Sequence, residues 1–290
     1  MITFPNAKIN LGLHVVARRG DGYHNLETVF YPIPLCDALE IVPSGDGEAH
    51  LHCYGRLVDC PPEKNLVMRA FRLLERECGV QPVDIHLYKR IPDGAGLGGG
   101  SSDAAHTLLM LNEMSHLGLS LEQLACMAAT LGADCPFFVY NRPMLAHGIG
   151  DELTPVDLSL TGRAVVLVKP PVSVSTAQAY ARVTPAVPPT PVQEIVSWPV
   201  ELWDGQLIND FEPSVFALHP ELWSIKLRLL LAGADYAAMS GSGSAIFGIF
   251  RTDRLALAAA KALASCGEVF TLPLDHGLSL IPEDPRQPQP

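Results

Sequence analysis

The stretch Pro92-Asp93-Gly94-Ala95-Gly96-Leu97-Gly98-Gly99-Gly100-Ser101-Ser102 lies between a segment that alternates like a strand, Val83 to Lys89, and a segment with the apolar spacing of a helix near Ala104. The order strand, glycine loop, helix places the loop at a helix N-terminus. Such a terminus offers unpaired N–H donors and about half a unit of positive charge. Glycines let the backbone approach a ligand without a Cβ in the way. We therefore expect this loop to bind phosphate.

Other families of nucleotide-binding loop fit less well. The spacing Gly94-x-Gly96-x-x-Gly99 satisfies the dinucleotide fingerprint, so a nicotinamide-dependent oxidoreductase is an alternative. That fingerprint expects a second strand ending in an acidic residue about 20 positions on, whereas Ser120 and Gln123 here predict the capping box of a further helix. No Gly-Lys-Ser/Thr follows the loop, which excludes a Walker A site. Neither His-Arg-Asp nor Asp-Phe-Gly occurs, which excludes a protein kinase.

Ser101 and Ser102 close the loop. Their hydroxyls could cap the helix, bind phosphate or coordinate Mg2+, and at least one of them is expected to be a cap.

Composition indicates a globular protein and disfavours several partners. The 290 residues are 48% hydrophobic and 18% charged, a length that favours two domains sharing a cleft. The net charge of -11 disfavours a nucleic-acid or anionic-membrane partner, and no obligate protein partner is evident. No apolar run approaches the roughly 20 residues that span a bilayer. The N-terminus has no secretory signal, so we expect a cytoplasmic protein.

The seven cysteines show no C-x-x-C spacing, and their odd number argues against a disulfide framework and a structural zinc site. They are expected to be buried small hydrophobes. They are Cys36, Cys53, Cys60, Cys78, Cys126, Cys135 and Cys266.

Strands and one helix are expected upstream of the glycine loop. Apolar and polar residues alternate after Lys8, which predicts a strand that projects Lys8 and Asn10 to the same side. Further strands are expected over Glu27 to Pro34 and Ala38 to Val42, with antiparallel pairing. Asn65 to Cys78, closed by a glycine, predicts an amphipathic helix.

The second half restarts with an apolar strand, Ala164 to Val168, so we place the domains over residues 1–158 and 159–280. The order of helices and strands from Pro220 to Leu272 indicates an α+β sandwich with a ferredoxin-like pattern. The proline-rich segment Thr184 to Pro199 is expected to be a surface loop, and residues 281–290 a flexible tail.

Asp134 and Lys8 are the candidate catalytic residues. Phosphoryl transfer needs an acceptor for the proton of the attacking hydroxyl and cations facing the transferred group. Asp134 follows a helix end among apolar residues, so it suits a base, and it suits equally well a local cap of the turn led by Pro136. Lys8 could hold that carboxylate ionised or stabilise charge on phosphate. It could also be a charge on an edge strand.

Two other segments have a binding interpretation and a simpler one. Tyr23 and His24 follow a turn, and an aromatic ring beside a hydrogen-bonding group suits a nucleobase. They could also be ordinary surface residues. Ser240-Gly241-Ser242-Gly243-Ser244, between two apolar strands, could form a second anion nest or a hairpin turn.

Three segments together resemble the GHMP kinase superfamily, which includes galactokinase, homoserine kinase and mevalonate kinase. Pro5-Asn6-Ala7-Lys8-Ile9-Asn10-Leu11 matches the first motif, Pro92 to Ser102 with Asp103-Ala104-Ala105 the ATP loop, and Met239 to Ser244 the third motif. Gly22-Tyr23-His24-Asn25-Leu26-Glu27-Thr28 is similar to the segment of those members that act on a cytidine-diphosphate-linked sugar alcohol. The resemblance covers nearly the whole chain.

The resemblance implies a two-domain GHMP kinase fold. The N-terminal domain would be similar to domain 2 of ribosomal protein S5, and the C-terminal domain would be a ferredoxin-like α/β sandwich. The implied reaction is ATP-dependent phosphorylation, with Mg2+, of the 2-hydroxyl of CDP-methylerythritol in the non-mevalonate synthesis of isoprenoid precursors. Another small alcohol is the alternative acceptor.

The resemblance also implies roles for single residues. Lys8 and Asp134 would be the catalytic pair, with Asp134 taking the proton of the acceptor hydroxyl, and no protein residue is assigned as a metal ligand. ATP contacts would be Asn65, Lys89, Pro92, Asp93, Gly94, Ala95, Gly96, Leu97, Gly98, Gly99, Gly100, Ser101 and Ser102. Substrate contacts would be Asn10, Tyr23, His24, Thr176, Tyr180, Gly241 and Ser242.

Overall fold

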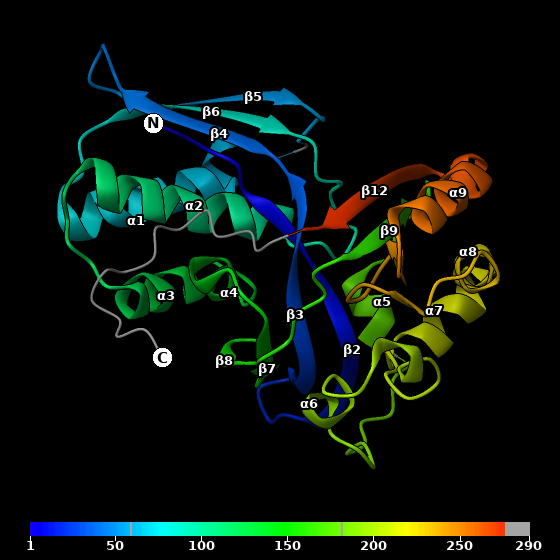
Figure 1. Ribbon diagram of the computed structural model, residues 1–290. Coiled ribbons are helices and arrows are strands. Elements are labelled where there is room, and N and C mark those ends of the chain that lie inside the picture. The colour runs from blue at the N-terminus through cyan, green and yellow to red at the C-terminus, as the bar shows by residue number, and fades with distance from the viewer. Residues whose placement is uncertain (59, 181, 276–290) are drawn as a thin grey trace.

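The computed structural model describes residues 1–58, 60–180 and 182–275, and the predicted tail over 281–290 lies outside them. Three four-stranded sheets organise the described chain. In Figure 1 the long strands β2 and β3 run between the helices α1 to α4 and the elements of the C-terminal half. Both halves therefore meet at β2, the strand that carries Lys8 and Asn10.

The first sheet is covered on one face by helices. Its strands, in spatial order, are β1 (Ile2–Thr3), β4 (Ala38–Pro43), β6 (Val83–Lys89) and β5 (His50–Gly55). The covering helices are α1 (Leu66–Cys78) and α2 (Gly99–Met114), the first of which follows the 3-10 turn η1 (Pro62–Lys64). The predicted helix over α1 is confirmed: Asn65 caps its start and Gly79 ends it in the left-handed conformation.

The second sheet has the order β2 (Asn6–Arg18), β3 (His24–Cys36), β7 (Met144–His147) and β8 (Glu152–Pro155). The register of β2 on β3 shifts between Leu11 and His14, so β2 carries a bulge there. Gly12 at this bulge has a φ of 63° and packs against Leu207 from the other half of the chain. Helices α3 (Leu121–Ala129) and α4 (Cys135–Tyr140) follow α2, and the predicted capping box of Ser120 and Gln123 is formed.

The third sheet has the antiparallel order β10 (Tyr236–Met239), β11 (Ile246–Phe250), β9 (Arg163–Lys169) and β12 (Glu268–Leu274). Its main helices are α8 (Pro220–Leu231) and α9 (Asp253–Leu263), the latter followed by η3 (Ala264–Cys266). The resulting β-α-β-β-α-β order confirms the ferredoxin-like prediction. Between β9 and α8 lie α5 (Thr176–Tyr180), α6 (Val192–Ile195), η2 (Val200–Leu202) and α7 (Glu212–Leu218).

Two sequence expectations are wrong. The segment Thr184 to Pro199 is not only a surface loop, because Val192 and Ile195 of α6 are buried in the core that contains β2 and β3. The helix was not predicted because it has only four residues and prolines lie on both sides of it. The cysteines are not buried as a group: Cys135 is buried, Cys36 and Cys266 are half-buried, and the other four are exposed.

The two halves share one hydrophobic core. Ile9 and Leu11 of β2 belong to the same buried cluster as Val165 and Leu167 of β9. The domain boundary near residue 158 therefore stays a prediction, since packing is continuous across it.

Replacement of Gly12 should destabilise the fold more than replacement of Gly79. Both glycines have positive φ, 63° and 71°, which costs an alanine roughly 1–2 kcal/mol. A Cβ on Gly12 would lie 2.6 Å from Leu207 Cδ1, whereas one on Gly79 would meet no described atom within 4 Å. Urea unfolding should show the larger loss of unfolding free energy for Gly12→Ala. Equal losses in Gly12→Ala and Gly79→Ala would contradict the steric contact.

Candidate active site

A cavity of about 280 Å3 lies where β2, β3, the glycine loop and the segment 240–244 meet. It brings together predicted residues from distant parts of the chain. The predicted site residues on its wall are Lys8, Asn10, Gly94, Gly96, Gly98, Asp134, Thr176, Tyr180, Gly241 and Ser242.

Lys8 and Asp134 face each other on this wall. Lys8 Nζ lies 3.4 Å from Asp134 Oδ2, and the lysine side chain is 4% exposed whereas that of Asp134 is 35% exposed. Lys8 Nζ also donates to Asn10 Oδ1 at 2.7 Å and lies 4.8 Å from the centre of the Phe30 ring. Asp134 precedes α4, yet its side chain makes no capping hydrogen bond. The carboxylate is thus directed to the lysine and the cavity instead of the helix.

The glycine loop has the backbone of an anion nest. Gly94, Gly96 and Gly98 have φ of 58°, 76° and 71°, and left-handed residues that alternate with ordinary ones turn successive N–H groups toward one side. A Cβ on Gly96 would lie 2.0 Å from the carbonyl oxygen of Ser240, and one on Gly98 would lie 2.8 Å from the Phe138 ring. Side chains larger than hydrogen therefore cannot be placed at these two positions without moving their neighbours.

The prediction that a serine caps the following helix is wrong. Helix α2 begins at Gly99, so Ser101 and Ser102 lie within its first turn, and its N-cap is Gly98, with no side-chain cap. The first-turn N–H groups thus lack the side-chain partner that usually satisfies them. Ser102 is fully buried and its N–H donates to Gly98 O, while Ser101 is half-buried. Of the two, Ser101 has the more accessible hydroxyl.

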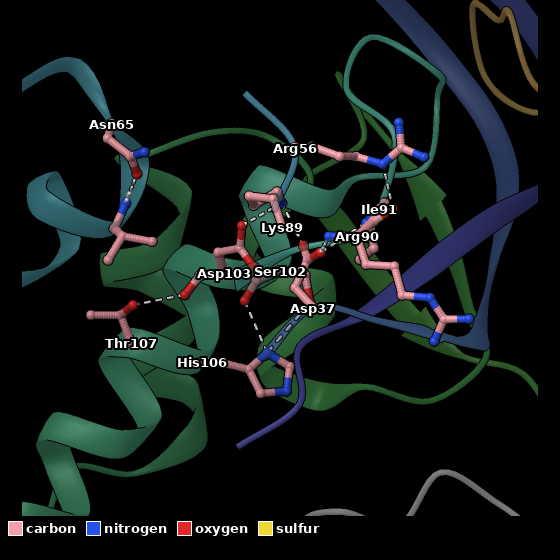
Figure 2. Close-up of polar contacts among 11 residues, drawn as sticks. Asp37, Arg56, Asn65, Lys89, Arg90, Ile91, Ser102, Asp103, His106 and Thr107 are labelled. Atoms are coloured by element: carbon pink, nitrogen blue, oxygen red, sulfur yellow. Dashed lines mark hydrogen bonds and ion pairs between the residues drawn. The ribbon is translucent and has the colours of Figure 1, made fainter. Parts of the chain in front are cut away.

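Lys89, which was expected to contact ATP, lies in a buried ion-pair cluster. It does not belong to the cavity wall, and its buried ammonium donates to Asp37 Oδ2 and, at 2.7 Å, to Asp103 Oδ2 (Figure 2). Asp37 Oδ1 also accepts the backbone N–H groups of Arg90 and Ile91. Lys89 precedes the glycine loop and Asp103 follows it, so the ion pair ties the two ends of the loop together. The contact of Lys89 with ATP stays a prediction. Burial of the ammonium between two carboxylates disfavours it.

Asn65, also expected to contact ATP, is the N-cap of α1. Its Oδ1 accepts the N–H of Val67 at 2.9 Å as the cap of α1. Leu66 of the same helix lies 3.7 Å from the position of a Cβ on Gly100, so the start of α1 adjoins the glycine loop. The predicted contact of Asn65 with ATP is compatible with this place and remains a prediction.

The Lys89 cluster places two carboxylates around one ammonium in a buried space. Burial raises the pKa of Asp103 to about 8, with Lys89 opposing and Asp37 reinforcing that rise. Desolvation lowers the pKa of Lys89, but the two carboxylates outweigh it and the net direction is upward. The cluster therefore favours a charged lysine and, below about pH 8, a protonated Asp103.

An aromatic row adjoins the cavity, with Tyr180 and Phe211 on its wall and His24 outside the wall. The His24 ring stacks on Tyr180 at 4.9 Å between centres, and Tyr180 meets Phe211 edge-on at 4.8 Å. Thr176 Oγ1 lies 3.2 Å from Ser242 Oγ. Tyr23 is 61% exposed and is not part of the cavity wall, so the structure brings His24 and Tyr180 together but leaves Tyr23 at the surface.

Several residues of the cavity wall were given no individual role from the sequence, although Leu26, Thr28 and Gly243 lie in segments that the sequence singled out. Leu13, Leu26, Thr28, Phe30, Ile149, Gly150, Val174, Phe211 and Gly243 complete the cavity wall. Most are apolar and resemble core positions in sequence, so no local signal separates them from core. Asp37 could have been suspected, because it is an isolated acid between two apolar strands.

Within the described residues, no group of three or more His, Cys, Asp or Glu side chains is arranged to hold a metal ion. No described helix combines the length and apolarity required to cross a membrane.

Family models match both halves of the chain. The model of the GHMP kinases N-terminal domain matches residues 65–142, and that of the GHMP kinases C-terminal domain matches residues 201–269. A 4-diphosphocytidyl-2-C-methyl-D-erythritol kinase from Bacteroides thetaiotaomicron is 53% identical over 255 residues, which cover 87% of this chain and 93% of that protein. The chain belongs to the GHMP kinases, in the family of the 4-diphosphocytidyl-2-C-methyl-D-erythritol kinases.

A further relative and two solved structures are similar to this chain. A relative from Cytophaga hutchinsonii with the same kinase name is 46% identical over 253 residues, covering 87% of this chain and 93% of its own. A crystal structure of a 4-(cytidine 5'-diphospho)-2C-methyl-D-erythritol kinase superposes with a TM-score of 0.81 at 38% identity over 96% of this chain and 100% of that chain. Homoserine kinase from Cytophaga hutchinsonii, at 21% identity and a TM-score of 0.67, shares the fold over 93% of this chain and 95% of its own.

The oxidoreductase alternative does not fit this GHMP kinase. A dinucleotide fold needs a parallel strand after the helix that follows the glycine loop. Here α2 is followed by α3 and α4.

The proton on Asp103 should make stability depend on pH. Its pKa is raised from 3.8 to about 8, so between about pH 4 and pH 8 folding takes up a proton that the unfolded chain has lost, and the free energy of unfolding falls as pH rises. In Asp103→Asn this contribution is absent. The unfolding free energy of the variant minus that of the wild type should rise from pH 5 to about pH 8 and then level off.

Urea titrations across that range measure this difference. Asp157→Asn, at an exposed aspartate, is the matched control and should give a flat difference. Parallel curves for wild type and Asp103→Asn would show that Asp103 does not carry the proton.

Proposed function

We propose that this chain phosphorylates the 2-hydroxyl of 4-diphosphocytidyl-2-C-methyl-D-erythritol with ATP, giving the 2-phosphate and ADP, in the non-mevalonate synthesis of isoprenoid precursors. The observation that carries the proposal is the cavity whose wall contains Lys8, Asp134, the glycine nest and Tyr180, the ring on which His24 stacks. The relatives named above act, by their names, on this acceptor. ATP and a nucleotide-linked acceptor are intracellular metabolites, so the proposal places the enzyme in the cytoplasm.

The residues divide the reaction between them. The amides of Gly94 to Ser101 bind the phosphates of ATP at the start of α2. Asp134 accepts the proton of the acceptor hydroxyl as that oxygen attacks the γ-phosphate, and Lys8 stabilises the negative charge of the transferred group. Transfer is direct, so no covalent phosphoenzyme forms. Mg2+ bound to the nucleotide would neutralise phosphate charge, and the half-buried Ser101, in the first turn of α2, would offer a hydroxyl oxygen to help hold it.

The aromatic row supplies the recognition of cytosine. Tyr180 is fixed edge-on by Phe211 and stacks on His24, so a planar base would add to this stack from outside and meet a ring nitrogen. Tyr23 joins this group in the proposal by closing over the base from the surface. Asn10, Thr176, Gly241 and Ser242 contact the rest of the acceptor from the cavity wall.

A GHMP kinase acting on another small alcohol is the second candidate, because the nest and the catalytic pair contain nothing that is specific to one alcohol. ADP release measured over a panel of alcohols separates the two. The cytidyl acceptor should give a far larger kcat/KM than homoserine or mevalonate. A preference for either simple alcohol would reject the proposed acceptor.

Removal of the Asp134 carboxylate should stop turnover without unfolding the protein. General-base catalysis contributes roughly 10²–10⁴-fold, so Asp134→Ala should lose kcat by about that factor. Its side chain caps no helix, so thermal stability and ATP binding should persist. Coupled ADP release and calorimetric titration with ATP measure the two effects, and a kcat near that of the wild type would remove Asp134 from its role.

Loss of the Tyr180 ring should weaken binding of the acceptor and leave binding of ATP unchanged. Base stacking on an aromatic residue contributes roughly 1–3 kcal/mol, so Tyr180→Ala should raise the KM of the cytidyl acceptor by about one order of magnitude or more. The exposed Tyr54 on β5 lies outside the cavity, and Tyr54→Ala is the matched control. An unchanged acceptor KM in Tyr180→Ala would show that the base binds elsewhere.

A further inference from the structure

The segment that joins η2 to α7 reaches the cavity wall at Phe211, and its residues Asn209 and Asp210 have no role in the chemistry above. It crosses β2 at the bulge. Leu13, in the bulge, donates its N–H to Ile208 O at 2.8 Å, and its carbonyl accepts the N–H of Asp210 at 2.8 Å. The backbone groups that the bulge withdraws from β3 are thus used by the C-terminal half of the chain.

Asp210 fixes the two residues that follow on β2. Its Oδ2 accepts the N–H of Val15 at 2.8 Å, and its Oδ1 lies 3.2 Å from His14 Nδ1. Three consecutive residues of β2 are therefore held by one short segment. Leu13, the first of them, is on the cavity wall.

Asn209 holds the opposite wall. Its side chain is buried at 3% exposure, and its Nδ2 donates to Met239 O and to Gly241 O, both at 2.8 Å. Its Oδ1 accepts the N–H of Phe211 at 2.9 Å. Every hydrogen-bonding atom of this amide has a partner, and the partners flank Ser240 in the third motif. A buried amide that is satisfied in this way fixes its neighbours.

The same segment also supports the aromatic row. Phe211 lies on the cavity wall and meets Tyr180 edge-on. Residues 209–211 thus touch β2, the loop after β10 and the proposed base-stacking ring. These three parts come from distant regions of the chain.

We propose that Asn209 and Asp210 are positioning residues, which set the acceptor half of the cavity at a fixed distance from the catalytic strand β2. The inference rests on the proposed function. Neither side chain reaches the reacting atoms, so each acts through others: Asn209 through Gly241 and Phe211, and Asp210 through β2. A displacement of about 1 Å between reacting groups costs about 100-fold in rate.

Asn209→Ser tests this role, because it removes both donors to Met239 O and Gly241 O. The expected result is a fall of about 100-fold in kcat/KM for 4-diphosphocytidyl-2-C-methyl-D-erythritol, with an unchanged dissociation constant for ATP measured without acceptor. The Lys89 cluster holds the two ends of the glycine loop, and Ser240 holds it at Gly96 through a hydroxyl that Asn209 does not touch. ATP binding is therefore the readout that a general loosening of the protein would move and this role would not.

Asn112→Ser is the matched control. Asn112 makes a similar pair of side-chain bonds to the backbone, from Nδ2 to Leu119 O at 3.1 Å and from Leu119 N–H to Oδ1 at 3.0 Å, away from the cavity. It should lose thermal stability comparably and keep its kinetics. Equal acceptor kinetics in Asn209→Ser and Asn112→Ser would overturn the inference.

Asp210→Asn provides a second variant if Asn209→Ser does not fold. It keeps the shape of the side chain but cannot accept at both oxygens, so it should lose acceptor kcat/KM in the same direction. Acceptor kinetics like those of the wild type would overturn the role of Asp210. A wild-type protein without turnover on this acceptor would overturn the proposed function and this inference together, which distinguishes that failure from a failure of positioning alone.

Discussion

The close contact between Gly96 and Ser240 is the constraint on which the site depends. A Cβ at residue 96 would lie 2.0 Å from the Ser240 carbonyl, and the Ser240 hydroxyl donates to Gly96 O at 2.8 Å while accepting the N–H of Asn10. Lys8 N–H also donates to Leu97 O. Three motifs, over residues 5–11, 92–105 and 239–244, therefore contact one another here. The cavity exists because the glycine loop can approach the segment 240–244 this closely.

Charge is distributed so that an acidic protein can hold a polyphosphate. The net charge is -11, and the nest contributes backbone N–H groups instead of a basic patch. Of the two buried lysines, Lys8 faces the cavity and Lys89 is neutralised by Asp37 and Asp103 beneath the loop (Figure 2). One lysine therefore serves the transferred group, and the other serves the shape of the loop that binds it.

Sequence patterns predicted what is local and periodic. The glycine loop ahead of α2, the cap and end of α1 and the ferredoxin-like order follow from spacing within single segments. Asp134 could not be separated from a helix cap until the structure showed its side chain directed to Lys8. The partners of Lys89 and the role of Asn209 could not be predicted, because both depend on contacts between residues far apart in the sequence. The partners of Lys89 are 14 and 52 positions away, and those of Asn209 are 30 and 32 positions away. The prediction that Ser101 or Ser102 caps α2 was wrong because the helix begins at Gly99, two residues before Ser101.

A crystal structure with a non-hydrolysable ATP analogue and the cytidyl acceptor bound together tests this arrangement most directly. The γ-phosphate should lie on the amides at the start of α2, and the acceptor 2-hydroxyl should lie within about 3 Å of an Asp134 carboxylate oxygen. A triphosphate bound away from that helix start, or a hydroxyl directed away from Asp134, would contradict it.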